Sequence, residues 1–494
     1  METRALEPPT PSRLAQPVEP GRPIVRRDNG TRPWIDPLTR EHGFEPLRIE
    51  GTLPPELNGT LYRTGPAHFE SFGEPYGHWF DGDGAISAVR IDEGRAFGAV
   101  RFVQTEGLRH ERRAGRRIYG GYGTASRRSW RAPFGGRAKN TANTSCLAWG
   151  GRLLSLWEAG HPYEIDPQTL RTIGETDLGG AIPGAFSAHP HYVAALDTTF
   201  NFGVSYGRKT HLDLFALRRG GRADRLARFS IPPFMVHDFA ATDRHLIFFC
   251  SPLRLDLRVA ALNLGYYEQN LRWRPDEGTE ILIFPLRDLD RPIRLKADPF
   301  FQWHFVNAFE EGDEIVADFI HYDSFRATSE WLRSFLHRRP RVPMPGQPRR
   351  ARINLRRGSV SVDPFTDVVG EFPKVAPRAF GAAYRYFWMG AHSTPNRETD
   401  GLWDRIAKVD ARSGAVELTD LGPGQHPSEP IFVPRPGAQA EDDGWIVSAC
   451  YDTRSQHSFV AVLDARHPSA APLARLWFDH HIPMAFHGDF DQRR

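Results

Sequence analysis

The chain has 494 residues, and its 63 basic side chains nearly balance its 60 acidic ones, for a formal net charge of +3. So small a net charge excludes the strong positive field expected of a nucleic-acid-binding protein. The cysteines Cys146, Cys250 and Cys450 are widely spaced and odd in number, so they predict neither a disulfide framework nor a Cys-x-x-Cys metal pair. We therefore expect a protein of a reducing compartment, the cytoplasm.

Apolar residues are spread through the chain rather than gathered in one run. No stretch approaches the roughly 18 consecutive apolar residues of a membrane-spanning helix, and no apolar run follows the early charges as in a secretory signal. Aromatic side chains are abundant, with 33 Phe, 13 Tyr and 12 Trp, enough to line an apolar cavity as well as a core. No low-complexity linker divides the chain, so we expect one large domain.

The predicted elements begin after an N-terminal arm. Residues 1–44 are rich in Pro and Arg and predict an extended arm lying on the domain. Residues 45–494 predict a single domain of short strands, separated by turn dipeptides such as Asn58-Gly59 and Asp443-Gly444. Long helical patterns are scarce, which indicates an all-β fold.

A short phrase of strand, aspartate and turn recurs along the domain, at Asp166, Asp363, Asp410 and Asp464. In each place the carboxylate can accept hydrogen bonds from the backbone of the following turn. The last three copies follow one another at intervals of about 50 residues, close to the length of a four-stranded propeller blade. The phrase therefore favours a ring of repeated blades, although the same phrase is common in unrelated hairpins.

Two segments interrupt the strand pattern. In the first, at about 251–275, apolar residues recur at helical spacing, namely Leu253, Leu257, Ala260, Ala261 and Leu264. The part at 253–273 either makes peripheral contact with a membrane, to admit a lipid-soluble substrate, or packs on the domain, and the sequence leaves both open. The second segment, at about 324–357, is crowded with Arg and Pro and predicts a solvated surface loop.

Four histidines stand among aromatic or aliphatic neighbours, namely His189, His237, His304 and His487. A buried imidazole needs a partner for each ring nitrogen, and a transition metal gathers several imidazoles at one point. Any one of the 20 histidines, taken alone, is more often an ordinary core residue. Because the four are far apart in the chain, a shared metal requires four structural units that converge on a centre.

Three glutamates lie in apolar, strand-like contexts, namely Glu158, Glu371 and Glu429. Metal-bound imidazoles usually donate their second N–H to a carboxylate. A buried carboxylate without a partner is costly, so each of these residues is expected to serve an imidazole or an ion pair. They are candidates to orient the histidines, with ordinary salt bridges to the Arg-rich chain as the alternative.

From about Leu53 to Gly488 the chain resembles the carotenoid cleavage oxygenase family. The resemblance is carried by an ordered set of motifs: GTLYRTGP at 59–66, HWFDGDG at 78–84, KNTANT at 139–144, AHPH at 188–191, EFP at 371–373 and FHG at 486–488. Any one of these motifs is unspecific, whereas the ordered set is highly specific. The agreement is strongest with the bacterial apocarotenoid oxygenases.

The resemblance implies a seven-bladed β-propeller with a helical or loop cap over its metal-binding face. It implies one Fe(II) ion on the four histidines, with the three glutamates behind them. Spacing alone does not choose between His189 and His191, and the resemblance assigns the metal to His189. It also implies that the methyl group of Thr144 crowds an open coordination position. The all-nitrogen donor set does not itself select iron, since Cu(II) and Ni(II) bind such sites more tightly.

The implied reaction is the cleavage by dioxygen of one C=C bond of a carotenoid or apocarotenoid into two carbonyl products, with retinal as a specific expectation. A lipophilic polyene would be bound by burial, at about 25 cal/mol per Å² of apolar surface. Stilbene-cleaving relatives carry a Lys where this chain has Trp157, which favours a polyene. Lignostilbene cleavage and a non-catalytic retinoid-binding propeller are the alternatives. We expect neither a nucleic-acid partner nor an obligate protein partner.

Overall fold

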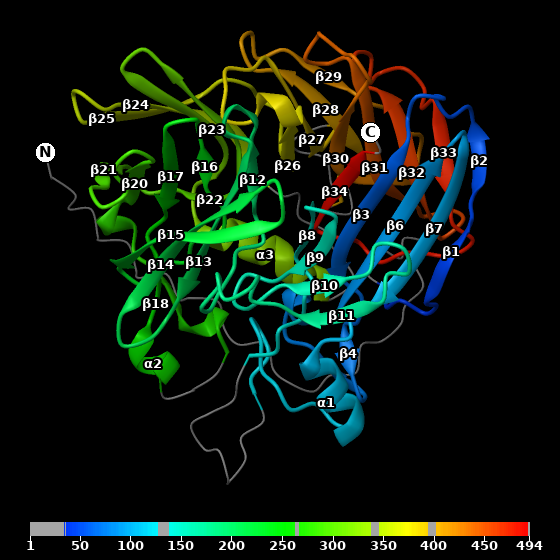
Figure 1. Ribbon diagram of the computed structural model, residues 1–494, viewed down its shortest axis with the longest axis horizontal. Helices are drawn as coiled ribbons and strands as arrows, with labels where there is room; N and C mark the ends of the chain where they lie inside the picture. Colours follow the sequence, from blue (N-terminus) through cyan, green and yellow to red (C-terminus); the bar gives the residue numbers. More distant parts are fainter. Residues whose placement is uncertain are drawn as a thin grey trace, which may run out of the picture.

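The computed structural model describes residues 34, 36–126, 138–261, 266–336, 345–393 and 402–492. In these residues, seven sheets of four or five antiparallel strands follow one another around the molecule (Figure 1). The innermost strands of neighbouring sheets contact one another around the centre, as β12 does with β16 and β30 does with β34. The fold is therefore a seven-bladed β-propeller, which confirms the fold class expected from the resemblance.

Five blades are four-stranded meanders in which the first strand lies innermost. In chain order they are β8 (Ser145–Trp149), β9 (Arg152–Leu156), β10 (Tyr163–Ile165) and β11 (Thr172–Glu175); β12 (His191–Val193), β13 (Thr198–Ser205), β14 (Thr210–Arg218) and β15 (Arg222–Ile231); β16 (Ala240–Ala241), β17 (His245–Cys250), β20 (Thr279–Pro285) and β21 (Ile293–Ala297); β22 (Phe301–Glu311), β23 (Glu314–Tyr322), β24 (Gln347–Asn354) and β25 (Ser359–Pro364); and β26 (Gly370–Val375), β27 (Tyr386–Ala391), β28 (Arg405–Asp410) and β29 (Val416–Leu418). Each of these blades thus presents one strand to the centre.

The other two blades combine both ends of the chain. The first contains β34 (His487–Gln492), β3 (Gly59–Pro66), β6 (Gly84–Asp92), β7 (Arg95–Phe102) and β1 (His42–Pro46), from the inside outward. The last contains β30 (Gln425–Pro434), β31 (Gly444–Asp452), β32 (His457–Asp464), β33 (Ala474–Trp477) and β2 (Arg48–Gly51). Blue N-terminal strands therefore lie beside red C-terminal ones in Figure 1. This double pairing joins the first blade to the last, so the chain ends close the ring.

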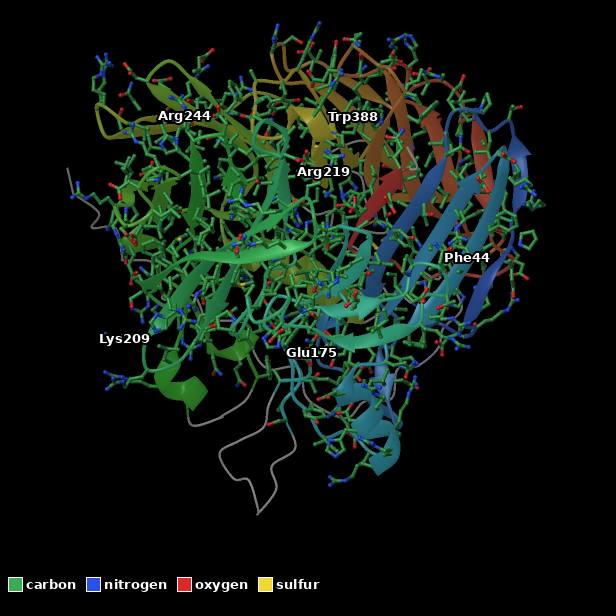
Figure 2. All side chains as sticks on the ribbon, viewed as in Figure 1. Phe44, Glu175, Lys209, Arg219, Arg244 and Trp388 are labelled. Atoms are coloured by element: carbon green, nitrogen blue, oxygen red, sulfur yellow. The ribbon has the colours of Figure 1, made fainter. Side chains whose placement is uncertain are left out.

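The blades pack face to face and bury side chains on both faces. In β17 the neighbours Phe248 and Phe249 point to opposite sides, as successive strand residues do. Phe248 belongs to an apolar cluster shared with the preceding blade, and Phe249 to one shared with the following blade. Figure 2 labels the fully buried Trp388 within a blade and the exposed Lys209 at the outside of the molecule. The core is therefore a series of interfaces between sheets.

The helices lie outside the blades. They are α1 (Glu106–Ala114), α2 (Leu257–Ala261) and α3 (Phe325–Leu336), and Figure 1 shows α1 and α2 beyond the sheets, at the lower edge of the view. No helix in the described ranges has the length and apolar character needed to cross a membrane. The remaining short elements are η1 (Trp79–Asp81), η2 (Ala194–Leu196), η3 (Glu268–Asn270), η4 (Pro275–Glu277), η5 (Pro377–Ala379), and the paired strands β4 (Glu70–Ser71) with β5 (Glu74–Pro75) and β18 (Leu253–Leu255) with β19 (Leu271–Trp273).

The repeated aspartate phrase marks one position in three blades. Asp166, Asp410 and Asp464 each stand at the end of a third strand, and each accepts a hydrogen bond from a backbone N–H two residues later at 2.8–2.9 Å. The propeller interpretation of these three copies is confirmed. Asp363 was wrongly grouped with them, because it lies in β25, the fourth strand of its blade.

The two interrupting segments and the end of the arm differ in part from their expected structures, whereas residues 1–33 of the arm lie outside the described residues. Helical structure begins only at Leu257, because residues 253–255 pair with β19 as β18, and Leu264 lies outside the described residues. The range 324–357 contains α3 and β24 rather than a loop throughout; within β24, Arg350 pairs with Asp318 of the adjacent strand. Residues 42–44 of the expected arm belong to β1, which covers the outer edge of β7.

Candidate metal centre

The four histidines predicted as ligands meet at the centre of the ring. One nitrogen from each of His189, His237, His304 and His487 lies within 4.8 Å of the others, and all four side chains are buried. His237 Nε2 and His304 Nε2 lie 3.3 Å apart. His189 precedes β12, His237 precedes β16, and the other two lie in β22 and β34. Four innermost positions of the propeller thus supply one imidazole each.

Irregularities in the strand backbone direct several of these side chains toward the centre. The pairing of β22 with β23 shifts register between Gln302 and Phe305, around His304. β26 shifts between Glu371 and Lys374, and β30 shifts between Pro427 and Pro430, around Glu429. A β-bulge bends the strand and re-aims side chains, and bulges are frequent beside active sites. The alternation of a regular strand would not deliver these residues to the same point.

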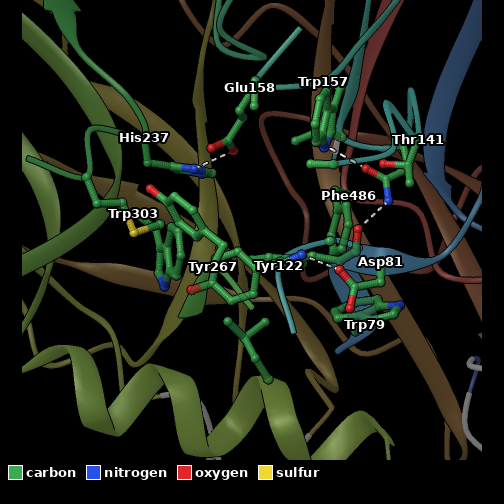
Figure 3. Close-up of a pocket in the computed structure, with 18 of the residues that line it drawn as sticks. Trp79, Asp81, Tyr122, Thr141, Trp157, Glu158, His237, Tyr267, Trp303 and Phe486 are labelled. Atoms are coloured by element: carbon green, nitrogen blue, oxygen red, sulfur yellow. Dashed lines mark hydrogen bonds and ion pairs between the residues drawn. The ribbon is translucent and has the colours of Figure 1, made fainter. Parts of the chain in front are cut away.

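Each of three histidines faces one of the predicted glutamates. His304 Nδ1 lies 2.6 Å from Glu371 Oε2, and His487 Nδ1 lies 2.8 Å from Glu429 Oε1. His237 Nδ1 lies 2.6 Å from Oε1 of Glu158, the contact drawn in Figure 3. A carboxylate at Nδ1 leaves Nε2 free to bind a metal. His189 is the exception, since no carboxylate contact is recorded for it in the described residues.

The glutamates themselves are held by further polar groups that the sequence did not indicate. Glu371 also accepts from the Tyr322 hydroxyl, at 2.8 Å, and from the Phe372 backbone N–H. Arg63 lies 2.7 Å from Glu429 Oε2, and Lys374 lies 3.1 Å from Oε1. Although burial alone raises the pKa of Glu429, Lys374, His487 and Arg63 together hold it well below its usual range. Glu429 is therefore an anion at neutral pH.

Burial keeps two of the histidines neutral. It lowers the pKa of His487 to about 3 despite Glu429, and with the other three imidazoles it holds the pKa of His189 far below its usual value. For His304 burial also lowers the pKa, but the Glu371 carboxylate outweighs it, so that the pKa is raised. A neutral imidazole is the form that donates its lone pair to a metal. The buried Nε2 of His189 has no hydrogen-bond partner, which fits a position reserved for a metal ion.

Thr144 lies beside this cluster. It directly precedes β8, and its carbonyl oxygen accepts a hydrogen bond from the His487 backbone N–H at 3.3 Å. Its hydroxyl donates to Asn143 Oδ1 at 3.2 Å. Since β8 is an innermost strand that carries no candidate ligand, Thr144 lies where a gap in the ring of imidazoles is expected. Its side chain also lines the cavity described next.

A cavity of about 570 Å³ leads to the histidines and has mainly aromatic and aliphatic walls. Figure 3 shows Trp79, Tyr122, Trp303 and Phe486 around it, together with His237. The wall also includes Trp331 and Leu332 of α3, and η1, which contacts α3, so these two elements cover the metal side of the propeller. The abundance of aromatic residues indicated such a cavity, but not which residues would form it.

Comparison with known proteins agrees with the geometry. The family model described as retinal pigment epithelial membrane protein matches residues 35–492. The apocarotenoid-15,15'-oxygenase of Synechocystis is 36% identical, over 90% of this chain and 92% of that protein. The chain belongs to this family, the carotenoid cleavage oxygenases.

A solved structure and a second relative extend the likeness. The cobalt-substituted Synechocystis enzyme superposes with a TM-score of 0.84 at 33% identity, covering 93% of this chain and 98% of that one. The lignostilbene-alpha,beta-dioxygenase isozyme III of Sphingomonas paucimobilis is 28% identical, over 92% of this chain and 95% of that protein. The resemblance found in the sequence motifs is therefore confirmed over nearly the whole chain.

Proposed function

We propose that this member of the family is a non-haem Fe(II) dioxygenase that cleaves one C=C bond of an apocarotenoid or carotenoid into two aldehydes. The observation that carries the proposal is a cluster of four buried imidazoles, three of which line a mainly apolar cavity. The Synechocystis relative, an apocarotenoid-15,15'-oxygenase, supports the apocarotenoid class of substrate. Retinal is the specific product that we propose. Residues 45–494 would act as one catalytic domain.

In this proposal His189, His237, His304 and His487 hold one iron ion. The iron supplies the activation of dioxygen when it is bound. Glu158, Glu371 and Glu429 fix the tautomer and orientation of three imidazoles through their Nδ1 atoms. Thr144 limits access to the side of the site that lacks an imidazole. No side chain is assigned to proton transfer, because oxidative cleavage of a C=C bond into two carbonyls needs no net proton transfer.

The wall of the cavity suits an uncharged, elongated substrate. Its charged groups are mostly engaged elsewhere: Lys139 contacts Tyr76, Asp83 and Glu111 at 2.8–2.9 Å. Asp81 accepts hydrogen bonds from Thr124 and from two backbone N–H groups. A ligand therefore meets mainly apolar surface, and burial of that surface is what binds a polyene. Trp157, which also lines the cavity, offers no cation to a phenol.

The test is turnover by the iron-loaded protein. Supplied with dioxygen and a panel of apocarotenals of graded length, the protein should bleach polyene absorbance, and mass spectrometry should find two aldehydes whose carbons add up to those of the substrate. His304→Ala should abolish bleaching. Cleavage of hydroxystilbenes without cleavage of any polyene would instead favour the lignostilbene reaction. A protein that binds retinoid but neither iron nor oxygen would support the carrier alternative.

A cytoplasmic location is part of this proposal. The three cysteines are free and buried, which supports a reducing compartment. Peripheral membrane contact through 253–273 is proposed as the route for a lipophilic substrate, supported by the apolar residues around α2. Flotation with phosphatidylcholine vesicles tests it: the protein should float with the vesicles, and recovery of all the protein in the lipid-free fraction would contradict the contact.

A further inference from the structure

His191 was the one histidine that the sequence left as a rival to His189, and the structure gives it a different partner. Its Nε2 lies 2.7 Å from Oδ1 of Asp238. The ring stacks on Phe380, with centroids 4.3 Å apart and planes 8° from parallel. His191 therefore points away from the cluster of imidazoles and toward a carboxylate.

Asp238 receives hydrogen bonds from three places at once. It directly follows His237 and is only 1% exposed. Its Oδ1 also accepts from the Phe239 backbone N–H at 2.8 Å, and its Oδ2 accepts from the Phe305 backbone N–H at 2.8 Å. Phe305 directly follows His304. The Asp238 carboxylate thus connects three parts of the chain. These are the backbone that follows His237, the backbone that follows His304, and the side chain of His191, two residues after His189.

The position of these groups in the propeller explains why a carboxylate is needed. β12, β16 and β22 are innermost strands of successive blades and lie next to one another (Figure 1). An innermost strand has no strand partner on its inner edge, so its buried N–H groups need another acceptor. The Asp238 carboxylate supplies that acceptor to the Phe239 and Phe305 N–H groups and also faces Nε2 of His191.

We propose that Asp238, together with His191, is a positioning residue that ties together the three neighbouring blades supplying His189, His237 and His304. Neither side chain lines the substrate cavity, so the pair acts on the geometry of the metal ligands and not on substrate contacts. His487 is held separately, through Glu429 and the Thr144 carbonyl. The inference rests on the proposed iron site.

The experiment compares Asp238→Asn and His191→Phe with the wild type. An asparagine cannot accept at both atoms, and a phenylalanine keeps the ring stack on Phe380 but removes the N–H donor. Fe(II) affinity is measured anaerobically by competition with a chelator, and the site geometry by electron paramagnetic resonance of the nitric oxide adduct. Asp213→Asn is the matched control: Asp213, in the third strand of its blade, is also 1% exposed and pairs with Arg228 of the fourth strand.

We expect both variants to lose about tenfold in iron affinity, the lower end of the range for residues behind metal ligands. Their nitric oxide spectra should broaden or shift, kcat should fall, and KM for the polyene should stay unchanged. His191→Gln, which keeps an N–H donor, should restore most of the affinity, and Asp213→Asn should behave as the wild type.

The two possible failures are distinguishable. A wild-type protein that binds no iron overturns the proposed function itself. A wild type that binds iron, beside Asp238→Asn and His191→Phe with unchanged affinity and spectra, overturns the positioning role alone. If Asp238→Asn does not fold, the contrast between His191→Phe and His191→Gln decides, and equal affinity in those two variants would also overturn it.

Discussion

At the scale of single residues, each of the three glutamates contacts a histidine, but their surroundings differ. The Glu158 side chain is 32% exposed, on the cavity wall, whereas Glu429 is fully buried beside Arg63, itself only 2% exposed. A charge that loses its partner inside a protein is far more costly than one that water can reach. The same substitution should therefore have different effects on stability at the two sites.

We predict that Glu429→Gln lowers the free energy of unfolding of the iron-free protein by about 3 kcal/mol or more, because Arg63 is left without its counter-charge. Glu158→Gln should cost about 1 kcal/mol or less. Both variants should lose about 10- to 100-fold in iron affinity, since each frees one imidazole from its carboxylate. Urea denaturation and chelator competition measure the two quantities, and an equal loss of stability in both variants would contradict the argument.

His78 connects a single side chain to the pH dependence of stability. It is 1% exposed, burial lowers its pKa to about 4, and its Nδ1 accepts the Phe80 N–H at the start of η1. Between pH 6.5 and about 4 the unfolded chain binds a proton here that the folded protein does not. Stability is therefore lost as the pH falls through this range, by up to about 1.4 kcal/mol per pH unit from this residue.

His78→Asn should remove that contribution while keeping an acceptor at the start of η1. Unfolding free energies measured across the same pH range should fall less steeply in the variant than in the wild type. Parallel curves for the two proteins would show that His78 is protonated in the folded state or does not titrate in the unfolded one.

At the scale of elements, the irregular parts of strands and the helix over the cavity do the positioning. Phe372, next to Glu371, has a φ of 58°, and its ring lies 4.9 Å from that of His487. Such a conformation is uncommon outside glycine, and it persists where its surroundings fix it. α3 in turn is anchored by Glu268 of η3, which accepts from Ser329 at 2.9 Å and contacts Arg333 at 3.0 Å.

We predict that Glu268→Gln loosens the α3 wall of the cavity. Loss of charge-assisted bonds worth about 1.5 kcal/mol should raise KM for the polyene about tenfold. The value of kcat should change little, because α3 carries none of the metal ligands. Glu330→Gln is the control, since Glu330 lies on α3 itself but its side chain is 52% exposed. Steady-state kinetics check the result, and a fall in kcat with KM unchanged would place Glu268 at the chemistry instead.

At the scale of the whole molecule, the metal site and the closed ring depend on each other. The four candidate ligands come from four blades, and His487 lies in β34, the strand that closes the first blade against β3. An ion held by all four binds only the folded ring, so binding must stabilise the fold by linkage. Iron at about 100 times its dissociation constant should contribute about 2.7 kcal/mol.

For a chain of this length that stabilisation corresponds to a rise in Tm of about 3 °C on adding Fe(II), reversed by a chelator. Scanning calorimetry under anaerobic conditions measures it. His304→Ala should show little or no rise, because it removes one of the four imidazoles. An equal rise in that variant would mean that iron stabilises the protein from some other site.

The sequence by itself determined the family, the candidate ligands and their carboxylates. These residues stand in short, ordered motifs such as AHPH and FHG, and side-chain chemistry limits what a buried histidine or glutamate can do. The positions of the turn aspartates Asp166, Asp410 and Asp464 could also be predicted from the sequence, because each accepts a hydrogen bond from a backbone N–H only two residues later.

Only the tertiary structure decided how those residues are used. In the folded protein His191 contacts Asp238, whereas His189 belongs to the cluster of imidazoles. Arg63 contacts Glu429, although the two are far apart in the sequence. It also made β24 from an Arg-rich stretch, by pairing Arg350 with Asp318 of the adjacent strand. Local patterns report neighbours a few residues away, whereas ring closure and β-bulges bring together segments whose separation leaves no periodic trace.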